Sequence, residues 1–138
     1  MLIITKLKKI VTQKKLSETI YFVGHKTHVD AWLKHANIYI TASRWEGLPY
    51  GILEAFKYQL PSIASDSPGH IDCIQNKETG LLFEKNNSSE LVTCINEIIN
   101  NSHLKKSLVT KANHQLQAIF NEGVMITEIN KIYDQYAQ

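Results

Sequence analysis

Residues 44–55 of this chain are RWEGLPYGILEA, and they follow the apolar run IYIT at residues 38–41. The apolar run predicts a strand, the Gly-Leu-Pro segment predicts a turn, and the residues after it predict a helix from Gly51 to about Tyr58. Glu46 stands at the start of the turn, and Glu54 stands about one helical turn beyond it. The order of strand, loop and helix therefore places two carboxylates beyond the end of one strand.

An anion-binding site is predicted between these carboxylates. The amides of Tyr50, Gly51 and Ile52 open the predicted helix, and a helix N-terminus attracts anions because its first N–H groups have no partner within the helix. Carboxylates such as Glu46 and Glu54 accept hydrogen bonds from hydroxyl groups. A ligand with phosphate in the middle and hydroxyl-rich sugars at both ends fits this arrangement. The residues thus predict a nucleotide-sugar site.

The rest of the chain alternates between strand-like and helix-like segments. Strands are predicted at Leu2–Ile4, Ile20–Val23, Ile38–Thr41, Pro61–Ser65 and Gly80–Phe83. Helices are predicted at 6–16, Val29–His35, Gly51–Tyr58, after Pro68-Gly69, from a capping box at Asn87 and Glu90, and finally at about 102–120 and 124–137. This alternation predicts one α/β domain over residues 1–138, with a Rossmann-like, doubly wound parallel sheet. Loops that follow its strands, at Glu46 and at Asp66–Gly69, should open onto one edge.

Four segments resemble the group 1 glycosyltransferases, also called glycosyltransferase family 4. Residues 43–55 match the family pattern S-x-x-E-G-x-x-x-x-x-L-E-A, and residues 60–66 resemble its G-x-P-V strand. Residues 79–83 resemble its T-G-x-L strand, and residues 20–24 its V-x-F-x-G strand. The resemblance covers roughly residues 18 to 100. It implies the C-terminal, donor-binding half of a GT-B fold.

The resemblance also implies an activity and a set of residues. A glycosyltransferase of hexosyltransferase type would transfer sugar with retention, without a metal or cofactor, from a UDP- or GDP-sugar during synthesis of capsule, O-antigen or exopolysaccharide. It implies that the catalytic Glu46 contacts the sugar hydroxyls and that Glu54 contacts the ribose. The donor site would comprise Glu46, Gly47, Leu48, Tyr50, Gly51, Ile52 and Glu54. Position alone adds two candidates: His25, with an ordinary loop histidine as the alternative, and Arg44, with a surface arginine as the alternative.

The chain departs from the family at its beginning. The C-terminal half of these enzymes starts with a strand that ends in Gly-Arg and has a downstream Lys-Gly, and residues 1–19 offer no counterpart. We therefore expect an incomplete domain, truncated at its N-terminus, as a truncated gene product, an expressed fragment or half of a split enzyme. The isolated chain is predicted to be inactive without an acceptor-binding domain or chain. The alternative is a non-catalytic remnant, or an interaction subunit with the same fold.

Composition limits the partners and the compartment. The net charge of +2 is too small to predict nucleic-acid binding, and no apolar run approaches the ~20 residues of a membrane span. Cys73 and Cys94 fit no metal or redox spacing, nor do the histidines suggest a metal site, and unpaired thiols fit a reducing cytoplasm. The lysine-rich segment 6–15 could lie peripherally on the inner face of a membrane, and a solvated helix face is the alternative.

Overall fold

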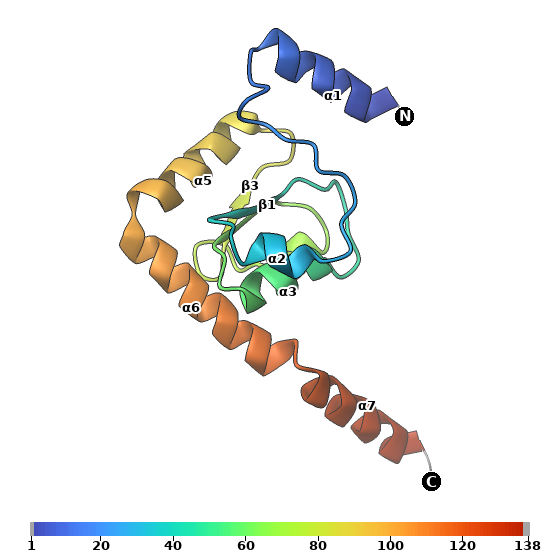
Figure 1. The fold of residues 1–138 in the computed structure, drawn as a ribbon. Helices are drawn as coiled ribbons and strands as arrows, with labels where there is room; N and C mark the ends of the chain where they lie inside the picture. Colours follow the sequence, from blue (N-terminus) through green and yellow to red (C-terminus); the bar gives the residue numbers. More distant parts are fainter. Residues whose placement is uncertain (1, 137–138) are drawn as a thin grey trace.

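The computed structural model describes residues 2–136, which form a three-stranded parallel sheet with helices on both faces (Figure 1). The elements in chain order are α1 (Leu2–Gln13), α2 (Val29–Leu33), β1 (Tyr39–Thr41), α3 (Tyr50–Lys57), β2 (Ser62–Ser65), α4 (His70–Cys73), β3 (Leu81–Phe83), α5 (Ser88–Asn100), α6 (Ser102–Ile119) and α7 (Glu122–Tyr136). The strands lie in the order β1-β2-β3, with Ile40 paired to Ile63 and Ile63 paired to Leu81. The parallel α/β fold that the sequence predicted is confirmed.

The hydrophobic core is divided by β2, whose four residues are all buried. Because successive side chains of a strand point to opposite faces, Ile63 and Ala64 enter different halves of the core. Ala64 packs with residues of α3, α4 and α6, namely Ile52, Phe56, Cys73 and Ala112. Ile63 packs with residues of β3, α5 and the start of α6, namely Leu81, Phe83, Cys94, Ile98 and Leu108. Both faces of the sheet are therefore covered, as a doubly wound fold requires.

The predicted helix cap at Asn87 is present in part. The Asn87 side chain accepts a hydrogen bond from the Glu90 N–H (3.1 Å), which satisfies one free donor of the first turn of α5. The Glu90 carboxylate does not return to the Asn87 backbone, as a reciprocal capping box would require. It accepts instead from the N–H of Glu84 (2.6 Å) and so ties the end of β3 to the start of α5.

Two of the predicted strands are wrong. Residues Leu2–Ile4 belong to α1, because Ile3, Leu7 and Ile10 continue a helical repeat that three residues alone could not reveal. Residues 20–23 form no regular element, and all four are exposed. A strand needs hydrogen bonds from a neighbouring strand, and none of the described residues offers one to this segment.

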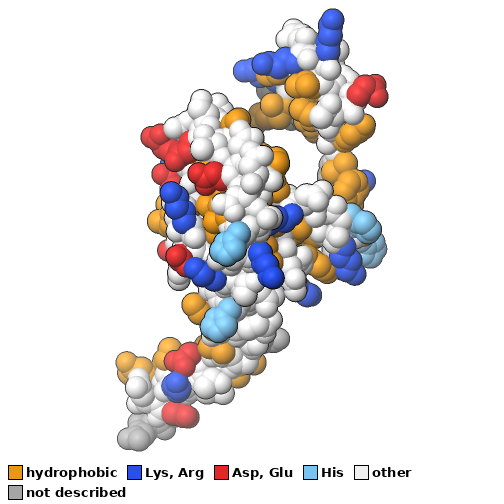
Figure 2. Space-filling model, turned by 90° about the vertical axis from the view of Figure 1, so that its left-hand side faces the viewer, with side chains coloured by type: hydrophobic (Ala, Val, Ile, Leu, Met, Phe, Trp, Pro, Cys, Tyr) orange, Lys and Arg blue, Asp and Glu red, His pale blue; other side chains and the backbone are white. Residues whose placement is uncertain are grey.

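One side of β1 has no partner strand within residues 2–136. The Tyr39 N–H donates to the carbonyl oxygen of Pro61 (3.0 Å), on the β2 side. Because backbone groups alternate along a strand, the N–H and C=O of Ile40 point away from β2. Figure 2 shows an opening between the segment that follows α1 and the body of the molecule. The first strand of the sheet is therefore an open edge.

Helices α1 and α7 project from opposite ends of the molecule (Figure 1). The residues of α1 whose side chains are described are exposed except the half-buried Val11, and α7 exposes the apolar side chains Met125, Ile126, Ile129, Ile132, Tyr133 and Tyr136. No helix among residues 2–136 has both the length and the apolar character needed to cross a bilayer. The predicted end of the last helix at residue 137 lies outside the described residues.

The reactivity of the two buried cysteines tests whether the core protects their thiols from solvent. Burial, and then the charge of Asp72, raises the pKa of the Cys73 thiol to about 11, and burial, and then Glu97, raises the pKa of Cys94. At pH 8 a pKa of 11 leaves roughly one thiol in a thousand as the reactive thiolate. We expect iodoacetamide to alkylate the native chain about 100-fold more slowly than the urea-unfolded chain, measured by mass spectrometry. Equal rates would mean that neither thiol is protected.

Candidate functional site

The candidate site is built from two loops at the carboxyl ends of neighbouring strands. Residues 42–49, here named the Glu46 loop, join β1 to α3, and residues 66–69, the Asp66 loop, join β2 to α4. The Glu46 N–H donates to the carbonyl oxygen of Pro68 (3.1 Å). The hydroxyls of Ser65 and Ser67 both donate to the carbonyl oxygen of Ser43, at 2.7 and 2.9 Å. The two loops thus lie together at one edge of the sheet, as their places after parallel strands predict.

Gly69 allows the closest approach between the loops. Its φ of 83° and ψ of −45° lie in a region that residues with a side chain rarely adopt. A Cβ at this position would lie 2.5 Å from the carbonyl oxygen of Glu46 and 2.7 Å from that of Gly47. Only glycine therefore fits both the backbone conformation and the space beneath the Glu46 loop.

Tyr39 connects the two glutamates electrostatically. Its hydroxyl lies against the α carbon of Gly51, so that a side chain at residue 51 would collide with it. Burial raises the pKa of the Tyr39 phenol most, and the negative charges of Glu54 and then of Glu46 raise it further. The phenol therefore keeps its proton and remains a hydrogen-bond donor at neutral pH. Both carboxylates act on this one hydroxyl at the first turn of α3.

The carboxylates of Glu46 and Glu54 have no partner of their own. Both residues are exposed, and neither side chain makes a hydrogen bond or ion pair with any of residues 2–136. Carboxylates in this state are open to hydrogen bonds from ligand hydroxyls. Within the same residues no group of three or more His, Cys, Asp or Glu side chains is placed to hold a metal ion.

The start of α3 offers fewer free amides than the sequence suggests. The N–H of Tyr50 donates to Leu48 and that of Ile52 to Pro49, both at 2.9 Å. The Gly51 N–H has no hydrogen-bond partner among residues 2–136, and no side chain caps α3. The side chain of Ile52 is fully buried, so that this residue meets a ligand only through its backbone. The anion-binding capacity of the helix start is thus centred on Gly51.

Leu48 and Tyr50 are exposed beside the junction of α6 and α7. They line a hollow of about 470 Å³ together with Leu53, Ile119, Phe120, Asn121 and Met125. Gly47, the other predicted donor-site residue in this loop, has no atom near the position that a Cβ would take. Of the predicted donor-site residues, Glu46, Gly47, Leu48, Tyr50 and Glu54 are thus exposed, Gly51 is half-buried and Ile52 is buried.

Arg44 and His25, the two further candidates, are bonded to neither glutamate. Arg44 lines a separate hollow of about 360 Å³ with residues from the ends of β2 and β3, including Ser65, Phe83 and Lys85. His25 lies in the exposed, irregular segment between α1 and α2. Neither side chain makes a hydrogen bond or ion pair with Glu46 or Glu54. The structure thus shows no direct bond from either candidate to the two glutamates, and the roles predicted for Arg44 and His25 stay predictions.

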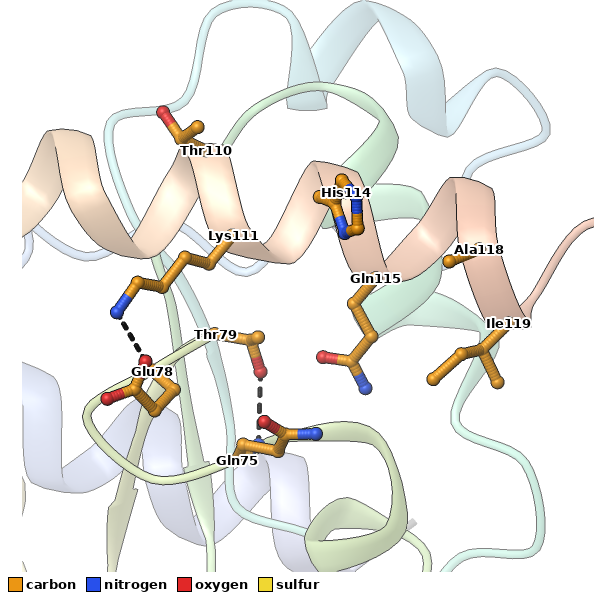
Figure 3. Close-up of a pocket in the computed structure, with 9 residues that line it drawn as sticks. All are labelled: Gln75, Glu78, Thr79, Thr110, Lys111, His114, Gln115, Ala118 and Ile119. Carbon is orange, nitrogen blue, oxygen red and sulfur yellow. Dashed lines mark hydrogen bonds and ion pairs between the residues drawn. The ribbon is translucent and has the colours of Figure 1, made fainter.

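A larger hollow lies elsewhere on the molecule. It measures about 500 Å³ and lies between α6 and the turn before β3 (Figure 3). Glu78 pairs with Lys111 across it, and the Gln115 side chain donates to the carbonyl oxygen of Cys73 (3.1 Å). Because this turn stands at the amino end of β3, the hollow is at the opposite edge of the sheet from the Glu46 loop. Its size alone does not make it the site.

Sequence reasoning missed Tyr39 and a buried cluster beneath the loops. Tyr39 interrupts an otherwise aliphatic strand just before the motif, which is a usable signal. The cluster comprises Ser65, Ser67 and His70, whose side chains lie within hydrogen-bond distance of one another. Nothing in the residue order Ser-Asp-Ser-Pro-Gly-His distinguishes these buried groups from ordinary loop residues.

Known proteins resemble this chain in sequence and in fold. The family described as glycosyl transferases group 1 matches residues 5–115. An uncharacterized glycosyltransferase of Haemophilus influenzae is 31% identical over 107 residues, which are 77% of this chain and 30% of that protein. An Escherichia coli protein is 26% identical over 125 residues, 91% of this chain and 31% of that protein. It is named as a UDP-Gal:alpha-D-GlcNAc-diphosphoundecaprenol alpha-1,3-galactosyltransferase.

The structural comparison agrees with the sequence comparison. The crystal structure of Anabaena HepE in complex with UDP matches with a TM-score of 0.89 at 18% identity, over 96% of this chain and 36% of that chain. The present chain thus spans about a third of the length of its relatives. Its fold is part of the C-terminal half of a GT-B fold. Since the family match extends over most of its residues, the chain belongs to the group 1 glycosyltransferases.

Proposed function

We propose that this chain forms the donor-binding portion of a retaining glycosyltransferase that acts in surface polysaccharide synthesis. The observation that carries the proposal is the arrangement at the start of α3. Glu46 and Glu54 present exposed carboxylates without hydrogen-bond partners, and between them in sequence the Gly51 amide is unpaired, with the Tyr39 hydroxyl packed against Gly51. This edge of a parallel sheet is where doubly wound folds bind ligands.

Each part of this arrangement suits one part of a nucleotide sugar. The first turn of α3 attracts the diphosphate, whose negative charge grows as the glycosidic bond to the sugar breaks. Glu46 accepts hydrogen bonds from sugar hydroxyls, and Glu54 accepts them from the ribose. In this proposal neither glutamate is a nucleophile. The sugar passes to an acceptor hydroxyl, and the nucleoside diphosphate leaves.

The relatives support the class of substrate. Anabaena HepE has been crystallised with UDP and with UDP-glucose, and the Escherichia coli relative is named for a UDP-galactose donor. Other relatives are named for capsular polysaccharide and lipopolysaccharide core synthesis. A UDP- or GDP-sugar donor, an acceptor-binding domain or chain as partner, and a place at the cytoplasmic face of a membrane are therefore part of the proposal.

The second candidate is an interaction subunit without catalysis. The exposed apolar residues of α7, such as Ile129, Ile132 and Tyr133, favour it because such a stripe on a helix usually packs against a partner. The two candidates differ in whether the start of α3 binds a nucleotide. Nucleotide titration therefore separates them.

We expect UDP or GDP to bind weakly, in the ~millimolar range, and to depend on Glu54. Hydrogen bonds to a charged group contribute about 1.5 to 3 kcal/mol, so that Glu54→Ala should weaken binding by roughly ten- to a hundredfold. Titration followed by NMR suits this range, with shifts expected at Gly47 to Glu54. Glu97→Ala removes an exposed carboxylate from α5 and should leave the affinity unchanged.

Two results would change the proposal. The absence of shifts around Gly51 at saturating nucleotide would favour the interaction subunit. Equal affinity of Glu54→Ala and the unchanged chain would keep an anion site at the start of α3 but remove Glu54 from it.

A further inference from the structure

His70 is buried beneath the two loops of the candidate site. It is the first residue of α4 and is 0% exposed. Its Nδ1 lies 2.9 Å from the carbonyl oxygen of Ser65, 3.0 Å from the hydroxyl oxygen of Ser67 and 3.2 Å from that of Ser65. One ring nitrogen thus meets three oxygen atoms at the end of β2.

The direction of these hydrogen bonds follows from the chemistry of the groups. A carbonyl oxygen can only accept, so that Nδ1 carries the hydrogen and donates it towards Ser65 O. Because Nδ1 then accepts nothing, the hydroxyl hydrogens of Ser65 and Ser67 must point elsewhere. Both hydroxyls donate to the carbonyl oxygen of Ser43, at 2.7 and 2.9 Å. The hydrogen on one histidine nitrogen therefore directs two hydroxyls onto one carbonyl of the Glu46 loop.

The other ring nitrogen contributes nothing to this arrangement. His70 Nε2 is buried and has no partner among the described residues. A buried polar atom without a partner is unfavourable, and an apolar side chain of similar size would avoid it. Packing alone therefore does not account for a histidine at this position. What distinguishes it from a leucine is the donor at Nδ1.

We propose that His70 is a positioning residue for the Glu46 loop. Through Ser65 and Ser67 it holds Ser43 at the beginning of the loop, while the Asp66 loop holds Glu46 through the carbonyl oxygen of Pro68. Because hydrogen bonds hold the loop at both Ser43 and Glu46, the loop keeps one position relative to α3. The consequence for ligand binding rests on the proposed donor site, whereas the consequence for the loop itself does not.

Three substitutions at His70 test the donor at Nδ1. In His70→Asn the side-chain amide can place a donor where Nδ1 lies, in His70→Gln it reaches the place of Nε2, and His70→Leu has no donor. We expect the Glu46 amide to exchange hydrogen at the original rate in the asparagine variant and about tenfold faster in the other two. UDP affinity, measured by NMR titration, should be unchanged in the asparagine variant and lower in the glutamine and leucine variants. Ser62→Ala removes a buried hydroxyl of β2 that donates to the carbonyl oxygen of Leu60, and it should change neither the exchange rate nor the UDP affinity.

The outcomes separate positioning from packing. If the leucine variant keeps the original protection of Glu46, or if the asparagine and glutamine variants lose it equally, the proposal is wrong. If His70→Leu fails to fold, the double variant Ser65→Ala, Ser67→Ala keeps the histidine and should show the same fast exchange. Lack of UDP binding by the unchanged chain counts against the proposed function only, because amide exchange decides the role of His70 independently.

Discussion

The 138-residue chain, purified on its own, is expected to transfer no sugar from UDP- or GDP-sugars to any acceptor. Holding an acceptor against a donor in a reactive geometry corresponds to an effective concentration of about 10⁵ to 10⁸ M. The groups gathered at the start of α3 are those that would bind a donor. They also place little positive charge near a diphosphate, because Arg44 lines another hollow and the amides of Tyr50 and Ile52 already have partners.

The assay should follow both release of nucleoside diphosphate and glycosylation of lipid-linked acceptors. Glu46→Gln is the control, since it removes the charge of a predicted catalytic residue and keeps its size. Turnover by the unchanged chain that disappears in Glu46→Gln would contradict the expectation. It would show that these residues alone orient both substrates.

Of the substitutions proposed here, Gly69→Ala should lower the free energy of unfolding the most. The backbone conformation at φ 83° is strained for alanine, and the added Cβ would lie 2.5 Å from the carbonyl oxygen of Glu46. Strain at one such residue costs about 1 to 3 kcal/mol, and the collision adds to it, so that we expect a loss of about 2 to 4 kcal/mol. For a chain of this size the melting temperature should fall on the order of 10 °C.

Gly47→Ala is the matched control for Gly69→Ala. No atom lies within 4 Å of the position that its Cβ would take, and its φ is not in the left-handed region. We expect a change below about 0.5 kcal/mol, as for most exposed substitutions. Urea unfolding followed by circular dichroism would measure both variants. Similar losses in the two would mean that the contact between Gly69 and the Glu46 loop does not constrain the fold.

The sequence predicts the strand, loop and helix around Glu46 because local signals determine them. The apolar run at residues 38–41, the proline turn and the helix pattern of residues 51–58 each act over a few residues. The strand at residues 62–65 is equally clear, since it is buried on both faces. Given parallel strands, the meeting of the two loops follows from topology alone.

What the sequence could not provide depends on contacts between distant residues. Residues 20–23 have the composition of a strand, yet a strand exists only where a neighbour pairs with it. The amides of Tyr50 and Ile52 appear free in a sequence pattern, and the turn at Pro49 uses them. The contact of the Tyr39 hydroxyl with Gly51 and the burial of His70 likewise arise from tertiary packing. No local sequence pattern predicts such packing.

If the chain binds nucleotide as proposed, a strand that pairs with the open edge of β1 would be thermodynamically linked to that binding. The unpaired backbone groups of Ile40 lie one residue before the end of the strand that leads into the Glu46 loop. A parallel strand added there would bring its own carboxyl end to the same edge, and so add a second wall to the site. Any gain in nucleotide affinity from that strand must be matched by an equal gain in the strand's affinity when nucleotide is bound. On the proposed function, a dissociation constant measured for this chain would therefore report the state of its sheet edge as well as the chemistry of Glu54.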